Sequence, residues 1–364
     1  MIKSLLCVQG PVQLIAAIVA LEYQEKDDSA EREKYIVFFD LGVDENIVFS
    51  ELRNLIEKTY FKKIFFVSQS KIQSFYKHGR FLAKKMLRKT LCNNIFDELY
   101  MAYLGTYSTS LFGNCYKNAK KICYGDSFGV VGNDYFLKRK NHSLKEIIKT
   151  LFFDFTNRSI NFSFQTLILP EWIGNKNAKN VPLNVPSRDL VLSVIRKVSA
   201  SLNLSELDKF VNNKYCIVLP SNLHQAGLLS EKNELLLYKD IFDRIPSNMN
   251  IVVKPHPRMH SDFFKNPVFM NKNIVVLDFP KIAKLPIEFF ESFVKNAEFV
   301  VPLYSTSQQN LTYLYEIKIN QLLNEELVDN YFYPEKKMQA IEALEMNVIV
   351  SKNLENWNGK EFLN

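Results

Sequence analysis

Short apolar runs alternate with amphipathic stretches along the first third of the chain. The pattern predicts strands at residues 3–8, 35–40, 62–68, 98–103 and 120–125, with helices at 12–23, 46–58 and 72–91. Strands that are apolar throughout and separated by helices form parallel sheets covered on both faces. This part of the chain therefore predicts a doubly wound α/β domain.

The same alternation returns in the second half after an Asn- and Pro-rich segment at about 156–188 that has little periodicity. Strands are predicted at 214–220, 250–255, 273–279 and 297–304, and helices at 188–202, 232–244, 286–295 and 307–316. We therefore expect a GT-B architecture, with two doubly wound Rossmann-like domains facing an interdomain cleft. The expected boundaries are 1–185, 186–330 and a tail at 331–364 that packs back across the linker. Periplasmic binding proteins and some epimerases share this plan, so the fold alone does not choose a function.

The composition adds a constraint on the partner. The chain has 46 Lys and Arg and 39 Asp and Glu, which gives a net charge of +7. The excess points to an anionic partner. The cysteines are odd in number and form no CxxC pair, which favours free thiols in a reducing compartment over a zinc site: Cys7, Cys92, Cys115, Cys123 and Cys216.

The apolar stretch at 4–21 is interrupted by Gln9, Gly10, Pro11 and Gln13, so it predicts a strand, a turn and a helix. It is a poor signal peptide and too broken to span a membrane. We expect a cytoplasmic protein.

Cationic side chains follow the predicted strand at 250–255. Lys254, His256 and Arg258 alternate with Pro255 and Pro257, which restrict the backbone around the histidine. Such groups at the carboxyl end of a strand suit a phosphate, and a fixed His can also protonate a leaving group.

Hydroxyl groups follow the strand at 297–304. Ser305, Thr306 and Ser307 precede a predicted helix, whose N-terminal N–H groups favour an anion. Ser221 opens another polar segment after the strand at 214–220, where donor phosphates or an acceptor would pass.

In the first half, Asp126 lies between glycines after the strand at 120–125, where a carboxylate suits a general base, and Ser127 follows it. The turn formed by Gln9, Gly10, Pro11 and Gln13 offers amide groups to sugar hydroxyls. The chain has no acidic metal pair beside a nucleotide strand, no GxGxxG and no Walker A sequence. We therefore expect neither a metal nor a nicotinamide cofactor.

The order of these motifs resembles the bacterial GT-B sialyltransferases, namely the polysialyltransferase-like proteins and the family 52 lipooligosaccharide sialyltransferases. The resemblance rests on Q-G-P-x-Q-L, G-D-S-F-G, K-P-H-P-R, a Pro-x-Glu turn and a Ser-Thr strand end. It implies metal-independent, inverting transfer of sialic acid from CMP-sialic acid to a capsule or lipooligosaccharide glycan. The N-terminal domain would then bind the acceptor and the C-terminal domain the donor.

The resemblance also implies roles for individual residues. His256 and Pro257 would contact the CMP phosphate, as would Ser305 and Thr306. Asp126 would be the base, although this chain has one acid there where the family has two, and Glu288 would lie near the ribose.

Two other interpretations stay open. One is transfer of another CMP-activated ulosonic acid, such as Kdo, legionaminic acid or pseudaminic acid. The other is a non-catalytic protein of glycan assembly.

The segment Lys71–Lys89 contains seven Lys and Arg and no acidic residue, with apolar residues at helical spacing. It predicts an amphipathic surface helix. It also fits an anionic acceptor or the inner membrane surface. No nucleic-acid-binding motif accompanies it, so we expect no nucleic-acid partner.

Overall fold

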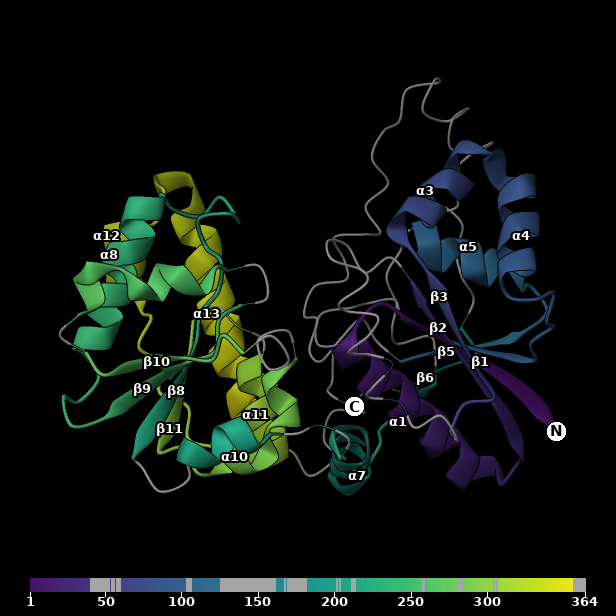
Figure 1. Cartoon of the computed structure of the whole chain (residues 1–364), viewed down its shortest axis with the longest axis horizontal. Helices are drawn as coiled ribbons and strands as arrows, with labels where there is room; N and C mark the ends of the chain where they lie inside the picture. The colour runs from purple at the N-terminus through teal and green to yellow at the C-terminus, as the bar shows by residue number, and fades with distance from the viewer. Residues whose placement is uncertain are drawn as a thin grey trace. The chain divides into compact units, whose positions relative to one another are not determined.

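The computed structural model describes residues 1–39, 53, 56, 60–102, 107–124, 162–166, 168, 182–200, 202, 204–210, 214–256, 259–270, 272–279, 285–303, 305 and 307–355. The chain forms two compact units, here called unit 1 (Met1–Leu202) and unit 2 (Asn203–Asn364). Each contains one parallel β-sheet with helices on both faces (Figure 1). The α/β prediction is confirmed.

The sheet of unit 1 has the strand order β3-β2-β1-β4-β5-β6-β7, and the pairings are parallel. Its strands are β1 (Ile2–Val8), β2 (Arg32–Phe39), β3 (Lys63–Val67), β4 (Glu98–Met101), β5 (Lys120–Cys123), β6 (Phe164–Thr166) and β7 (Leu183–Asn184). Since the chain moves outward from β1 in one direction and then returns to place β4 on its other side, the strand order reverses between β1 and β4.

Alternate residues of these apolar strands point to opposite faces, and helices cover both. Leu5 and Val37 belong to a core that includes side chains of α3 (Gln69–Lys77), α4 (Gly79–Thr90) and α5 (Tyr107–Cys115). On the other face lies α1 (Pro11–Asp28), which packs against α7 (Arg188–Ser199) (Figure 1).

Unit 2 repeats the plan with the strand order β10-β9-β8-β11. The strands are β8 (Tyr215–Leu219), β9 (Asn250–Val253), β10 (Ile274–Val276) and β11 (Phe299–Pro302), and all pairings are parallel. Its helices are η3 (Ser205–Phe210), α8 (Glu231–Asp243), η4 (Ser261–Lys265), η5 (Pro267–Phe269), η6 (Ile287–Phe289), α10 (Glu291–Lys295), α11 (Ser307–Tyr315), α12 (Glu325–Tyr331) and α13 (Pro334–Glu355).

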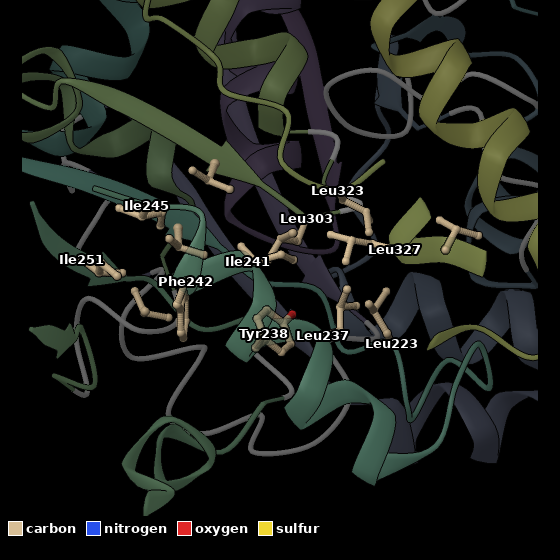
Figure 2. Close-up of a cluster of buried hydrophobic side chains, with 14 of the residues drawn as sticks. Leu223, Leu237, Tyr238, Ile241, Phe242, Ile245, Ile251, Leu303, Leu323 and Leu327 are labelled. Carbon is tan, nitrogen blue, oxygen red and sulfur yellow. The ribbon is translucent and has the colours of Figure 1, made fainter. Parts of the chain in front are cut away.

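One face of the unit 2 sheet carries a large core under α8, α12 and α13. Figure 2 shows how side chains of α8 meet residues of β9, of the segment after β11 and of α12: Leu237, Tyr238, Ile241, Phe242, Ile251, Leu303 and Leu327. On the opposite face Tyr215 of β8 stacks on Phe293 of α10, with ring centroids 5.2 Å apart. No helix in the described part of the chain is long and apolar enough to cross a membrane.

Two predicted helices are wrong in their extent. The helix predicted at 72–91 is two helices, because Gly79 adopts a left-handed conformation with a φ of 74°. The helix predicted at 286–295 is a 3₁₀ turn followed by a short α-helix. The helix predicted at 46–58 lies largely outside the described residues.

A buried ion pair joins the amino ends of two strands in unit 1. Arg32 at the start of β2 contacts Glu98 at the start of β4 through Nε to Oε2 (2.9 Å) and Nη2 to Oε1 (3.1 Å). Asp28 binds the same guanidinium, and Ser4 donates to Glu98. Burial raises the pKa of Glu98, but hydrogen bonds from Arg32 and Ser4 and the Arg32 charge outweigh it, so the net shift is downward.

We expect Arg32→Met to lower the free energy of unfolding of unit 1 by about 3–5 kcal/mol, because it leaves the buried Glu98 carboxylate with only the distant Lys120 ammonium, 4.0 Å from its Oε1. Urea denaturation measures the loss. The double variant Arg32→Met/Glu98→Leu should recover most of it. The matched control is Lys239→Met, which removes an exposed ion pair with Asp243 and should cost about 0–1 kcal/mol. Equal losses in the two single variants would contradict the prediction.

Arg32 also makes unit 1 sensitive to acid. The hydrogen bond from Arg32 lowers the pKa of Asp28 from 3.8 to about 2. A carboxylate with a lowered pKa stabilises the folded state above its unfolded pKa and loses that effect as the pH falls through its folded pKa. Unit 1 should therefore lose stability between about pH 4 and pH 2, and Arg32→Met should flatten this slope. Urea midpoints measured at each pH test it, and an unchanged slope in the variant would count against it.

Candidate functional site

The carboxyl ends of parallel strands meet at one edge of each sheet, and ligands of doubly wound folds bind at that edge where the strand order reverses. In unit 2 the reversal lies between β8 and β11. The segments that leave this edge are 220–230 after β8, 254–260 after β9 and 303–306 after β11. Most of the polar residues that the sequence singles out in this half of the chain belong to these segments, while Ser307 begins α11 and Glu288 lies in η6.

Two opposite charges are buried at this edge. Lys254 follows β9 directly and is 6% exposed, and Glu288 of η6 is 2% exposed. Burial lowers the pKa of Lys254 to about 8, and the Glu288 carboxylate opposes that shift. Burial raises the pKa of Glu288, while hydrogen bonds and the Lys254 charge oppose it. In both residues desolvation outweighs the attraction between the charges.

Helix α11 holds the Glu288 carboxylate. Asn310 Nδ2 donates to Glu288 Oε1 at 2.6 Å, and a hydrogen bond with the Ser307 side chain also favours the charged carboxylate. Tyr315, at the end of the same helix, donates its hydroxyl to the backbone carbonyl of Glu288. Asn310 is 3% exposed, and its Oδ1 has no hydrogen-bond partner among the described residues. One buried acceptor beside the charged pair is thus left open to a ligand or a water.

Ser305 shapes the entry into α11. Its Oγ accepts a hydrogen bond from the backbone N–H of Ser307 at 3.3 Å, and its carbonyl accepts one from Gln308 at 3.4 Å. Both serines are half-buried. The first turn of a helix presents N–H groups and a positive dipole end, which favour an anion.

Two side chains of α8 form hydrogen bonds with the backbone of the segment after β8. Tyr238 Oη accepts from the backbone N–H of Ser221 at 3.1 Å and lies 2.9 Å from its carbonyl, to which it donates. Glu234 Oε1 accepts from the backbone N–H of Leu223 at 2.8 Å. Burial raises the pKa of Glu234, and hydrogen bonds from the backbones of Leu223 and His224 oppose that rise. Two buried side chains therefore fix the polar loop at the switch point.

In unit 1 the side chain of Gln13 stabilises the predicted turn after β1. Gln13 Oε1 accepts from the backbone N–H of Gln9 at 2.9 Å, and Pro11 is the first residue of α1. Gly10 caps that helix in an extended conformation, and a Cβ at this position would meet nothing within 4 Å. Tyr124, directly after β5, donates to the Cys7 carbonyl at 2.5 Å and lies 3.2 Å from Gln13 Oε1. The end of β5 is thereby tied to the β1 turn.

The structure therefore brings Lys254, Glu288 and Ser307 into one cluster. His256 is half-buried two residues beyond Lys254, and its carbonyl accepts from Met259 in a turn. The remaining predicted site residues lie outside the described residues: Asp126, Ser127, Pro257, Arg258 and Thr306.

Four contacting residues were not among the predicted site residues: Asn310, Glu234, Tyr238 and Tyr124. Each contributes through a hydrogen bond to a segment far away in the sequence. The residues next to each one in the sequence therefore do not indicate that it belongs to the site. The exception is Glu234, a carboxylate in the first turn of a helix that follows a polar loop, which is a typical capping position.

The chain matches no protein-family model and no curated protein. Solved structures share its fold at low identity. UDP-GlcNAc 2-epimerase from Methanocaldococcus jannaschii is 14% identical with a TM-score of 0.51, covering 95% of this chain and 92% of its own. A structure of S. aureus MnaA with UDP is 11% identical with a TM-score of 0.54, covering 98% and 92%. UDP-N-acetylglucosamine 2-epimerase from Rickettsia bellii is 12% identical with a TM-score of 0.53, covering 98% and 95%.

These similarities confirm a GT-B-type fold with two Rossmann-like units. They also correct the predicted function. The resemblance to sialyltransferases, the CMP-sugar donor and sialyl transfer to a capsule or lipooligosaccharide glycan are wrong, because the similar structures described above are two UDP-GlcNAc 2-epimerases and a MnaA structure with UDP. The physical reason is that each motif is a short polar segment at a strand end. Such segments are common to Rossmann-like units and do not define the base or the sugar.

We expect the buried lysine to give unit 2 a distinctive pH dependence. A lysine whose pKa falls from 10.5 to about 8 on folding loses its proton earlier in the folded state, so rising pH favours folding across that interval. Wild type should gain stability relative to Lys254→Met from about pH 8 to pH 10.5, by up to about 1.4 kcal/mol per pH unit. Chemical denaturation at each pH measures it. Lys232→Met, which removes an exposed lysine of α8, is the matched control. A Lys254→Met difference that does not change with pH would refute the assignment.

Proposed function

We propose that this protein is an enzyme that acts on a UDP-sugar and that unit 2 holds the nucleotide. The observation that carries the proposal is the buried cluster of Lys254, Glu288 and Asn310 at the carboxyl edge of the unit 2 sheet. Burying charged groups is costly, and displaced pKa values gather at functional sites. The similarity to UDP-GlcNAc 2-epimerases supplies the class of ligand.

The cluster offers the chemistry that a nucleotide needs. A carboxylate accepts hydrogen bonds from ribose hydroxyls, and Glu288 is held in place by Asn310. The first turn of α11, with Ser305 and Ser307, suits phosphate oxygens. Lys254 adds a cation whose pKa of about 8 leaves it mostly protonated at neutral pH. A diphosphate, with more charge than the single phosphate of CMP, would gain more from these groups.

We further propose epimerisation at C2 of a UDP-N-acetylhexosamine as the reaction. Removing the C2 proton frees an electron pair, which forms a C1–C2 double bond as the C1–O bond to UDP breaks. Addition of UDP back to C1, with a proton delivered to the opposite face of C2, restores the bonds and completes the inversion. Asp126 stays our proposed proton acceptor, on the sequence argument that a carboxylate follows strand β5 at a ligand-binding edge.

Glu288→Gln should weaken UDP binding by about 10–100-fold, because it removes a charged hydrogen-bond acceptor. Isothermal titration calorimetry with UDP, and with CMP for comparison, measures the effect. Glu298→Gln is the matched control, since Glu298 is exposed just before β11, at the opposite edge of the same sheet. A wild-type protein that binds no UDP, or equal losses in the two variants, would refute the nucleotide site.

Turnover of UDP-GlcNAc in D₂O tests the reaction. Proton NMR should show the 2-epimer with deuterium at C2, and EDTA should not change the rate. We expect Asp126→Asn to lower kcat by about 10²–10⁴-fold while leaving UDP affinity unchanged. Release of UDP without the epimer would overturn epimerisation but keep the UDP-sugar site. A near wild-type kcat in the variant would exclude Asp126 as the base.

A further inference from the structure

The outer surface of α3 and α4 in unit 1 is strongly basic. We define the basic face as a set of exposed residues on these two helices: Lys71 and Lys77 of α3, and Phe81, Lys85, Arg88 and Lys89 of α4. The sequence contains no Asp or Glu from Gln69 to Phe96. Among the described residues, no carboxylate lies within ion-pair distance of Lys71, Lys77, Lys85 or Lys89. Within the part of the chain that the structure describes, the lysine charge of the basic face is therefore uncompensated.

An aromatic side chain lies in the middle of this charge. Phe81 is 82% exposed and its neighbour Leu82 is 47% exposed. The inner side of α4 packs into the core of unit 1 through the buried Ala83 and Leu87. Positions 81, 85 and 88 follow at helical spacing and lie opposite positions 83 and 87. Phe81 thus lies on the outward side of α4 with Lys85 and Lys89, whereas the guanidinium of Arg88 donates to the Cys115 carbonyl at 3.0 Å.

The break at Gly79 gives the basic face its width. Because Gly79 has a φ of 74°, α3 and α4 are separate helices that each bury one side, through Ile72 and Phe75 in α3. Figure 1 shows α3 and α4 as two separate helices, and each carries exposed lysines. The cations are therefore spread over two helices instead of forming one stripe.

We propose that the basic face docks on an anionic lipid bilayer. Clustered Lys and Arg are attracted to anionic headgroups, and aromatic rings partition into the headgroup region. An exposed phenylalanine is costly in water and gains nothing from phosphate charge alone, so its position among the cations favours a lipid surface over a nucleic-acid duplex, whose bases are stacked on one another. The apolar side of α4 is already used in the core, so docking does not require α4 to insert. This inference does not rest on the proposed function.

Vesicle cosedimentation tests the docking with the whole chain. The protein should bind vesicles of phosphatidylcholine mixed with phosphatidylglycerol, should bind phosphatidylcholine alone weakly, and should be released by salt. Lys85→Gln/Lys89→Gln should weaken binding by about 25-fold, at about fivefold for each lysine. Phe81→Ser should also weaken binding with the same vesicles. The matched control is Met270→Ser, which removes a 76% exposed apolar side chain from unit 2 and should have no effect.

None of the substituted residues is buried, so we expect each variant to fold. Thermal unfolding of each variant checks this. Equal binding to both kinds of vesicle would overturn the proposal, as would variants that bind like wild type. Salt-sensitive binding to a DNA duplex with no binding to the mixed vesicles would overturn it in favour of a nucleic acid. UDP affinity unchanged in these variants would show that the basic face acts apart from the nucleotide site.

Discussion

Parallel strand pairing is the constraint on which the rest of this structure depends. A parallel neighbour can be reached only by a crossover, so both sheets need helices on their faces, and strands such as Tyr215–Leu219 are buried throughout. The same pairing sends every carboxyl end to one edge. Where the chain turns from β8 outward and later returns to β11, the connections leave on opposite faces and open the edge between them. The candidate site follows from this topology before any side chain is considered.

Two pairs of buried opposite charges, an ion pair in unit 1 and the neighbouring charges of Lys254 and Glu288 in unit 2, differ in how desolvation and attraction balance. The Arg32–Glu98 pair at the amino end of β2 and β4 is bidentate, and Ser4 donates to the same carboxylate, so the pKa of Glu98 is lowered. Attraction outweighs desolvation there, as expected of a structural contact. At the carboxyl edge of unit 2, desolvation outweighs attraction for both Lys254 and Glu288. A buried pair of charges in which desolvation dominates contributes little to stability, which distinguishes this cluster from the structural pair in unit 1.

The pattern of apolar and polar residues was sufficient to predict the strands that are buried on both faces. Apolar runs predicted strands β1, β8 and β9 to within two residues, because a strand covered on both faces has no polar alternative. The pattern failed at Gly79, where apolar positions continue at helical spacing on both sides of the break and hide it. It also could not find Tyr124 or Tyr238, since a hydrogen bond to a distant backbone leaves no local periodicity.

The motifs at strand ends predicted a site for a phosphate-bearing ligand but gave the wrong nucleotide, and the reason is physical. Cations, hydroxyls and helix N-termini recognise a phosphate by charge and by hydrogen-bond donors, which CMP and UDP share. Discrimination between cytosine and uracil depends on the donors and acceptors at the edge of the base. A few polar atoms can supply it from the backbone of any loop that reaches the base, and backbone groups are the same in every sequence. Short side-chain motifs such as Lys254–Arg258 therefore predict where a nucleotide would lie, whereas its base depends on the fold around them.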